Sequence, residues 1–354
     1  MNILDRYIVG RILATTALVM AVIIALAVLI TFVGEQGDMG TGHYGGLEAF
    51  WYSLMSVPQL AWDLMPIGAL IGALLGLGSL ASSSELTVAR TAGISIGRLA
   101  VSVAVAGVLL VGIEVVLGEL LAPPLQQVAR QQKAIERFSN AVFGGGSAWV
   151  RDGNLILDVD RSKDGEARGG MLIFELSKDH HLLAMGRAVA AVAAEDHPWV
   201  LHGYTESRFV GDQIKVISEG VRTLNSHVSG QFLHLTTSDP GELASGPLWS
   251  LIGYYRANSL DAKPFLFAFW SRIARTCAIV FAVLLAIPFV LGPMRSSGTG
   301  ARLLLGLLLG LGFFFLQRFI ESGTIVFNLD PVMLAWLPTT ILAVVTLGLL
   351  AWTR

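Results

Sequence analysis

Charged side chains are scarce in this sequence. Only 14% of the 354 residues are Asp, Glu, Lys or Arg, and 54% are hydrophobic, whereas about a quarter of the residues in an ordinary soluble domain are charged. The charges also nearly cancel, because 24 Lys and Arg stand against 26 Asp and Glu, so no basic surface for nucleic acid is predicted. The composition therefore indicates an integral membrane protein.

Cysteine and the common catalytic motifs are also missing or nearly so. Cys277 is the only cysteine, which excludes an intrachain disulfide and a cysteine-rich metal site. The sequence contains no G-x-x-x-x-G-K-[ST] phosphate loop and no H-E-x-x-H motif. The seven histidines fall outside the apolar runs and lack a familiar metal spacing. We therefore expect a chain that is not an enzyme and that carries no cofactor or metal ion of its own.

Long apolar runs, by contrast, are abundant. Six of them reach the length of about 20 residues that a helix needs to cross a ~30 Å hydrocarbon core. They cover approximately Ile8–Val33, Leu54–Leu80, Leu99–Leu121, Phe265–Leu291, Leu303–Ile320 and Val332–Trp352. The sequence thus predicts an α-helical polytopic membrane protein with six transmembrane helices.

The basic residues of the short connections predict which side of the membrane each span end faces. With six crossings, one side receives Arg6, Arg11, Arg90, Arg98, Arg295, Arg302 and Arg354. The short loops on the other side, residues 34–47 and 322–331, contain no Lys or Arg. Because Lys and Arg are enriched in cytoplasmic loops, we expect both termini and residues 82–93 to be cytoplasmic.

A polar insert, residues 134–247, separates the third span from the fourth. Its strand-like runs are Leu155–Asp160, where Leu155, Leu157 and Val159 alternate with their neighbours, and Met171–Leu176, Leu182–Ala194, Trp199–Thr205, Gln213–Leu224 and Val228–Leu235. Many short strands without helices indicate an all-β sandwich or jellyroll-like domain. Three spans precede it, so we expect it outside the cytoplasm. The predicted order is three helices in residues 1–133, the β domain, and three helices in residues 248–354.

Residues 82–93, between the second and third spans, carry helix signals of their own. Ser82 and Glu85 have the S-x-x-E spacing of a capping box, Arg90 falls in the last turn, and Gly93 suits the left-handed residue that follows. These signals predict a helix of about ten residues, roughly 15 Å long. Since a tight turn suffices to join two spans, the helix has two interpretations. It is an interfacial helix or an extension of a span, or it is a knob that docks into a soluble partner.

Ionisable residues inside membrane spans are costly and often functional. Glu114 and Glu119 lie in the third span. Arg318 and Glu321 lie three apart near the outer end of the fifth span, on one helix face. This pair is either an ion pair that fixes packing or a polar contact that lines a cavity for a charged lipid.

A basic face is predicted just beyond the third span. Arg130, Lys133 and Arg137 recur every three or four residues on a helical extension that points away from the cytoplasm. Lys and Arg on that side oppose the usual bias. The face is either a solvated helix surface or a contact for the anionic groups of a lipid headgroup.

Several segments together resemble one known family. The chain opens with Leu4-Asp5-Arg6-Tyr7-Ile8, and residues 66–78 read P-I-G-A-L-I-G-A-L-L-G-L-G before Ser84-Glu85-Leu86. Gly118–Pro123 closes the third span, and Leu291–Ser296 follows the fourth. Over essentially its whole length the chain is similar to the LptF/LptG permeases of the lipopolysaccharide-exporting ABC transporter of Gram-negative bacteria. The L-D-R-Y-I start and the G-P-x-R-S segment are typical of the LptG branch.

The resemblance implies an assembly in the bacterial inner membrane. It implies a heterodimer with an LptF-like permease and two copies of an LptB-like ATPase, which binds the ATP and Mg that this chain does not. An LptC-like protein with a single span would lodge beside the first and fifth spans. The β domain would be a periplasmic jellyroll that passes lipopolysaccharide toward LptC-like and LptA-like jellyrolls.

The resemblance also assigns roles to residues. Glu85, Leu86, Arg90 and Gly93 fall in the family's coupling helix, which docks into the ATPase, and Glu85 matches the acidic residue at its start. The first and fifth spans resemble the walls of a cavity that takes lipopolysaccharide from the outer leaflet. Arg130 and Lys133 match basic positions that face the lipid A phosphates, and Arg318 is a further headgroup candidate.

The first span departs from the family pattern at its outer end. Where family members carry lysines, this sequence has Thr31, Gly37 and Asp38, with Glu35 nearby. Either Arg318 substitutes for those lysines, or the exported lipid carries fewer phosphates. Two other functions remain open at this point: a different lipid-extracting ABC permease, and a membrane scaffold or sensor with an external β domain.

Overall fold

The chain forms two compact units in a computed structural model. One unit comprises Met1–Ser139 and Lys263–Arg354, and the other comprises Asn140–Ala262. The structure describes residues 3–41, 43–138, 147–160, 170–177, 181–192, 199–210, 213–224, 240–292, 298–326 and 329–353.

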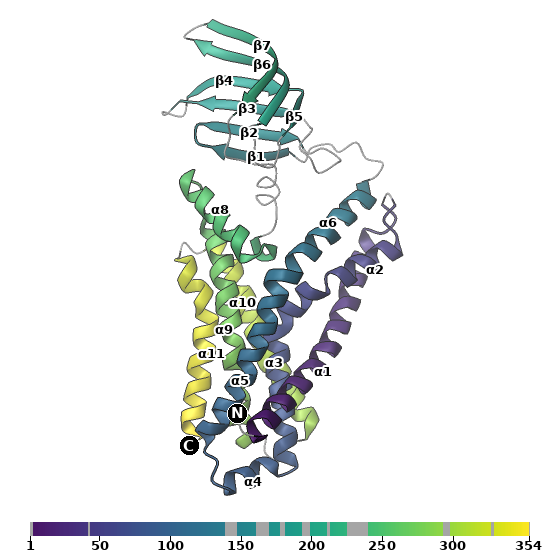
Figure 1. Ribbon diagram of the computed structural model, residues 1–354, viewed down its shortest axis with the longest axis vertical. Helices are drawn as coiled ribbons and strands as arrows, with labels where there is room; N and C mark the ends of the chain where they lie inside the picture. The colour runs from purple at the N-terminus through teal and green to yellow at the C-terminus, as the bar shows by residue number, and fades with distance from the viewer. Residues whose placement is uncertain are drawn as a thin grey trace. The chain divides into compact units, whose positions relative to one another are not determined.

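The first unit is helical. Its elements are α1 (Ile3–Gly34), η1 (Glu35–Gly37), α2 (Gly46–Met55), α3 (Val57–Ser82), α4 (Glu85–Thr91), α5 (Ile96–Val116), η2 (Leu117–Leu121), α6 (Ala122–Phe138), α9 (Lys263–Leu291), α10 (Thr299–Val326) and α11 (Pro331–Trp352). Among the described residues, six helical segments are long and apolar enough to cross a membrane, which confirms the six predicted spans. In Figure 1 the start of α1, the end of α11 and α4 lie at the same end of this unit.

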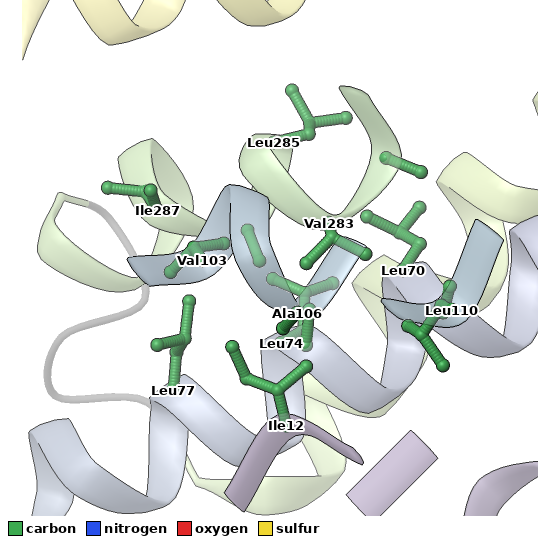
Figure 2. Close-up of a cluster of buried hydrophobic side chains, with 14 of the residues drawn as sticks. Ile12, Leu70, Leu74, Leu77, Val103, Ala106, Leu110, Val283, Leu285 and Ile287 are labelled. Carbon is green, nitrogen blue, oxygen red and sulfur yellow. The ribbon is translucent and has the colours of Figure 1, made fainter. Parts of the chain in front are cut away.

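The core of the helical unit lies between α1, α3, α5 and α9. Figure 2 shows Ile12 of α1, Leu74 of α3, Ala106 of α5 and Val283 of α9 meeting in one buried cluster. Helix α3 runs through its centre. A glycine permits the closest approach, because a Cβ at Gly72 would lie only 2.5 Å from the Cα of Thr16 in α1. Such small residues allow helices to pack closely within a bilayer.

The second unit is a curled antiparallel sheet with a short helix. Its strands are β1 (Ser147–Asp152), β2 (Leu155–Asp160), β3 (Met171–Leu176), β4 (Leu182–Ala188), β5 (Ala190–Val192), β6 (Trp199–Val210) and β7 (Gln213–Leu224). They pair in the order β1-β2-β3-β4-β6-β5, and β7 pairs with β6 (Figure 1). The turn η3 (Pro240–Glu242) and helix α8 (Ser245–Ala257) follow. The β domain predicted between the two sets of helices is confirmed by this sheet in the described residues.

Two strand predictions have different outcomes. The prediction of one strand over Leu182–Ala194 is wrong, because the chain breaks at Val189 between β4 and β5. The apolar character of the run continues across this break, so hydropathy gives no signal for it. The run Val228–Leu235 lies outside the described residues.

Strand β6 changes its buried face part-way along. Trp199 and Leu201 are buried in the sheet core, but beyond Gly203 the buried residues are Tyr204 and Glu206. Gly203 has a φ of +62°, in the left-handed region that favours glycine, and it turns the strand at this point. After this turn the polar side chains of Tyr204 and Glu206 lie on the buried face of the strand.

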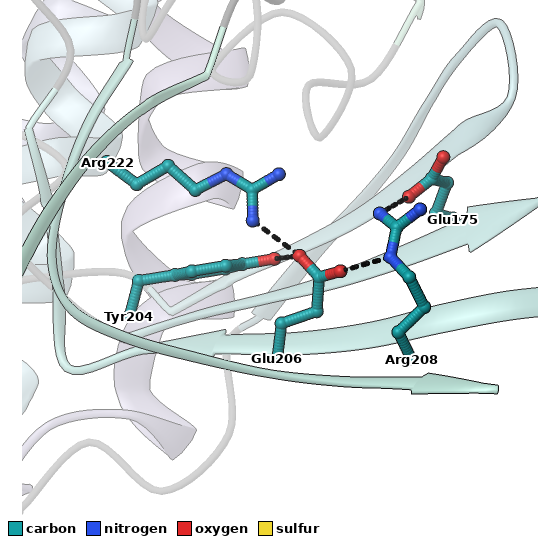
Figure 3. Close-up of polar contacts among 5 residues, drawn as sticks. All are labelled: Glu175, Tyr204, Glu206, Arg208 and Arg222. Carbon is teal, nitrogen blue, oxygen red and sulfur yellow. Dashed lines mark hydrogen bonds and ion pairs between the residues drawn. The ribbon is translucent and has the colours of Figure 1, made fainter. Parts of the chain in front are cut away.

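Glu206 is the centre of a polar group (Figure 3). Its side chain is 2% exposed and accepts hydrogen bonds from Tyr204 Oη at 2.9 Å, from Arg208 Nε at 2.8 Å and from Arg222. Arg208 also pairs with Glu175 at 2.8 Å. Burial acts to raise the pKa of Glu206, but these hydrogen bonds outweigh it and lower the pKa below its usual value. Burial and the bond to Glu206 raise the pKa of Tyr204 to about 12.

Candidate coupling and lipid-contact sites

Helix α4 begins differently from the prediction. Helix α3 continues to Ser82, whose hydroxyl bonds the carbonyls of Gly78 and Ser79, so the capping box of Ser82 with Glu85 is wrong. The start of α4 is marked instead by Ser84, with a φ of +62°. Ser83 Oγ donates to Glu85 Oε1 at 2.8 Å. Because the span extends further than expected, α4 has seven residues rather than about ten.

The end of α4 agrees with the prediction. Gly93 has a φ of +92°, and Arg90 lies in the last turn. The N–H groups of Gly93 and Ile94 donate to the carbonyls of Arg90 and Ala89 at 3.0 and 3.2 Å, the two bonds of a Schellman motif. This end fixes the direction in which the chain leaves α4 for α5.

One face of α4 is anchored and the other is exposed. Leu86 is buried in the core of the helical unit, whereas Glu85 and Val88 are exposed. The hydrogen bond from Ser83, followed by one from Tyr7 of α1, lowers the pKa of Glu85, which keeps this carboxylate ionised. The geometry therefore presents a negative charge and an apolar side chain on a short anchored helix, as a docking element requires.

Residues of the spans α1, α3 and α5 lie next to α4. Asp5 of α1 accepts a hydrogen bond from Ser102 Oγ of α5 at 2.8 Å and pairs with Arg98 at 3.5 Å. A small hollow between the start of α1, α4 and the start of α5 is lined by residues such as Leu4, Tyr7 and Leu86. Residues of α1, α4 and α5 therefore lie around one hollow at this end of the helical unit.

Lys133 of α6 lies in a carboxylate cluster at the other end of α1. Its Nζ is 2.6 Å from Glu35 and 3.0 Å from Asp38, and it lies 4.9 Å from the centre of the Tyr52 ring. Tyr44 Oη donates to Glu35 at 2.8 Å, and burial together with this bond raises the pKa of Tyr44. The lysine proposed from the sequence as a headgroup contact is therefore already paired within the chain.

The other headgroup candidates lie on two helices. Arg130 is exposed on α6, one turn before Lys133, while the side chain of Arg137 is outside the described residues. Arg318 of α10 pairs with Glu321 at 2.9 Å, so the ion pair that the spacing suggested is present. The Arg318 side chain is 59% exposed and that of Glu321 is 46% exposed. Solvent or lipid headgroups have access to both.

A cluster of charged residues lies inside the spans, and only some of its members were identified from the sequence. Arg275 of α9 pairs with Asp63 of α3 at 3.0 Å, and Arg272 of α9 pairs with Glu119 of η2 at 3.3 Å. The Trp62 ring lies close to both guanidinium groups, 3.5 Å from Arg275 and 4.3 Å from Arg272. Glu119 was identified from the sequence but its partner was not, because residues 153 positions apart in the chain meet only in the fold.

An apolar cavity of about 250 Å³ opens between α3, α9, α10 and α11. Its lining includes Ile67, Leu285, Leu308, Phe313 and Ile341. All of these residues belong to the membrane-spanning helices. The described lining residues offer contacts for hydrocarbon and no charged group. Among the described residues, no cluster of three or more His, Cys, Asp or Glu side chains has the arrangement of a metal site.

The comparison with known proteins is decisive for the family. The family model for "Lipopolysaccharide export system permease LptF/LptG" matches residues 6–352. The chain belongs to the LptF/LptG family. It is 30% identical over 357 residues to the LptG permease protein of the lipopolysaccharide export system of Escherichia coli (strain K12), with 99% of this chain and 98% of that protein covered. It is 27% identical over 360 residues to the LptG protein of Haemophilus influenzae, with 100% and 99% covered.

This result confirms the resemblance that the sequence motifs indicated. The match includes the six spans, α4 and the β insert, so family membership applies to the whole architecture and not to one segment. Both relatives described above are LptG proteins, as the start of the chain and the segment after the fourth span suggested.

Proposed function

We propose that this chain is a permease subunit that extracts lipopolysaccharide from the inner membrane and passes it toward the outer membrane. The observation that carries the proposal is the full-length match to the lipopolysaccharide export permeases, from residue 6 to residue 352. The six spans supply the part that is embedded in the membrane. The antiparallel β unit supplies a part suited to an aqueous compartment.

The energy for extraction comes, in this proposal, from a separate ATPase. The sequence has no phosphate loop, and α4 presents Glu85 and Val88 on an anchored helix between two spans. An LptB-like ATPase, in two copies, holds the ATP and Mg and docks at α4. The connections among α4, α1 and α5 then transmit its motion to the spans.

The permease half is completed by other proteins. An LptF-like chain forms the heterodimer, an LptC-like single span lies beside α1 and α10, and an LptA-like bridge receives the lipid. Both of these helices have exposed apolar side chains, which lipid or a neighbouring transmembrane helix would cover in a bilayer. They include Leu18 and Leu26 on α1 and the rings of Phe315 and Phe319 on α10. Both termini and α4 face the cytoplasm, and the β unit is periplasmic.

The headgroup contacts follow from the charges near the outer span ends. Arg130, Lys133 and Arg318 are the proposed partners of the lipid phosphates. Lys133 and Arg318 already have carboxylate partners, so a phosphate must displace or share them. The acyl chains have apolar surface on α1 and α10 and the apolar cavity beside α10.

Mass spectrometry of the purified complex tests the proposal. The chain is purified from membranes in mild detergent with its co-eluting proteins, and the bound lipids and proteins are identified. We expect lipopolysaccharide together with an ATPase and a second permease of the same family. Enrichment of another lipid class would favour a different lipid-extracting permease, and purification without an ATPase would favour a scaffold or sensor.

A further inference from the structure

Within the described part of the chain, Glu114 is the one member of the intramembrane charged cluster that has no ion-pair partner of its own. The cluster contains three acids, Asp63, Glu114 and Glu119, and two bases, Arg272 and Arg275. Asp63 and Glu119 each pair with one arginine. If all five residues were ionised, the cluster would carry one net negative charge inside the spans.

The surroundings of the cluster are shaped to hold these pairs. A widened π-helical turn, η2, interrupts the third span, and turns of this kind expose backbone carbonyls and recur at functional sites. Arg272 Nη2 donates to the Gly118 carbonyl of this turn at 2.6 Å. Gly118 has to be glycine, because a Cβ there would lie 2.3 Å from Nε1 of the Trp62 indole.

Neither carboxylate oxygen of Glu114 accepts a hydrogen bond within the described residues, although its side chain is 0% exposed. The Thr276 hydroxyl is nearby, but it donates to the Arg272 carbonyl at 2.9 Å. An ionised carboxylate that accepts no hydrogen bond is strongly disfavoured at a buried site of low dielectric constant. The protonated carboxyl group is neutral and avoids this cost.

The charged groups that face Glu114 come from the helices packed on it. Helix α9 contributes Arg275 and Arg272, and α3 contributes Asp63. The ionisable residues of α1 near α5 lie in its first turns, where Asp5 contacts Arg98 and Ser102 at the opposite end of α5. Both arginine charges that face Glu114 are therefore already balanced by Asp63 and Glu119.

We propose that Glu114 is a proton-binding site within the third span, and that charge balance with Asp63, Glu119, Arg272 and Arg275 keeps it protonated at neutral pH. Glu114 is a positioning residue in this account. While Glu114 is neutral, the two remaining acids pair with the two bases, and these pairs join α3, η2 and α9. Ionisation of Glu114 would upset this balance at the centre of the three spans. The inference does not depend on which lipid the chain carries.

Infrared spectroscopy of the full-length protein in a detergent without ester groups tests this inference at pH 7. A protonated carboxyl group gives a carbonyl stretch that is separate from the bands of ionised carboxylates and of the backbone. We expect this band in the unmodified protein and its loss in Glu114→Gln, which preserves the shape of the side chain. Glu321→Gln is the matched control, because Glu321 is an exposed partner of Arg318, and the band should persist in it.

Charge balance leads to a second and more specific prediction. Glu119→Gln removes one negative charge, so Glu114 should then ionise and the carbonyl band should disappear even though Glu114 is intact. Labelling the unmodified protein with ¹³C-glutamate should shift the band, which identifies it without any substitution. A missing or unshifted band in the unmodified protein, or a band that survives in Glu114→Gln or in Glu119→Gln, would overturn the proposal.

Discussion

The ammonium group of Lys133 lies 2.6 Å from the carboxylate of Glu35, which joins α6 to the turn that ends the first span. Asp38 pairs with the same ammonium group at 3.0 Å. The family resemblance implied a lipid-phosphate contact for Lys133, and it implied lysines at the end of the first span, where this sequence has acids. The structure relates these two expectations, because the acids at the end of the first span and the lysine at the end of the third neutralise each other.

Loss of Lys133 is expected to destabilise the end of the helical unit where η1 and α6 meet. Lys133→Ala leaves the largely buried Glu35 without its cation, and the loss of a charged hydrogen bond costs about 1.5–3 kcal/mol. Thermal unfolding of the purified protein measures the effect. A double-mutant cycle with Glu35→Gln should show coupling between the two sites. Additive effects would show that the pair contributes nothing to stability.

Glu85 is expected to matter for ATPase docking and not for folding. Glu85→Ala removes an exposed carboxylate from α4 without touching the buried anchor Leu86. The amount of ATPase recovered with the complex, or the ATP hydrolysed per lipid released, should change at least several-fold. Glu219→Ala, an exposed acid of β7, is the charge-matched control and should leave both unchanged. Equal behaviour of the two variants would refute the docking role.

Charge exchange separates two roles for Arg318. If Arg318 binds a lipid phosphate, Arg318→Glu should reduce export, and a second change, Glu321→Arg, should not restore it. Loss of one charge-assisted hydrogen bond of about 1.5–3 kcal/mol corresponds to roughly tenfold or more in affinity. Recovery of lipopolysaccharide export in the exchanged double variant would show that the pair at 2.9 Å is structural only.

The Glu206 cluster makes the β unit sensitive to acid. Hydrogen bonds hold the pKa of Glu206 below its unfolded value of about 4.3. Its stabilisation is therefore fully present above about pH 4.3 and is lost as the pH falls through the lower folded value. The protection of β6 and β7 peptides from hydrogen exchange, taken relative to the intrinsic exchange rate at each pH, should fall below about pH 4. In Glu206→Gln, this protection should be lower at about pH 7 and should change less with pH, and an unchanged profile would contradict this account.

The helices were predictable to the extent that hydropathy determines them. Six apolar runs gave six spans, and Gly93 was recognised as the left-handed residue after α4. The start of α4 was not predictable in the same way, since the S-x-x-E pattern at Ser82 is overridden by the continuation of α3. A local capping signal is weak beside the packing of a long buried helix.

Pairings between residues that are distant in the chain could not be predicted from the sequence. Lys133 with Glu35 and Arg272 with Glu119 each join segments that are far apart in the chain, and a single sequence contains no signal for such contacts. Arg318 with Glu321 was anticipated because both lie on one face of one helix. The proposed site residues therefore came from local spacing and family resemblance, whereas the pairing of Lys133 with Glu35 and Asp38 came only from the structure.

Reconstitution of the complete complex tests the central claim most directly. The chain is placed with an LptF-like permease, an LptB-like ATPase and an LptC-like protein in vesicles that contain lipopolysaccharide, and transfer to a soluble LptA-like acceptor is measured. We predict transfer that requires ATP and that falls when Glu85→Ala is present. Transfer that is independent of ATP, or no transfer of lipopolysaccharide alongside normal ATP hydrolysis and complex formation, would contradict the assignment of this chain as an export permease.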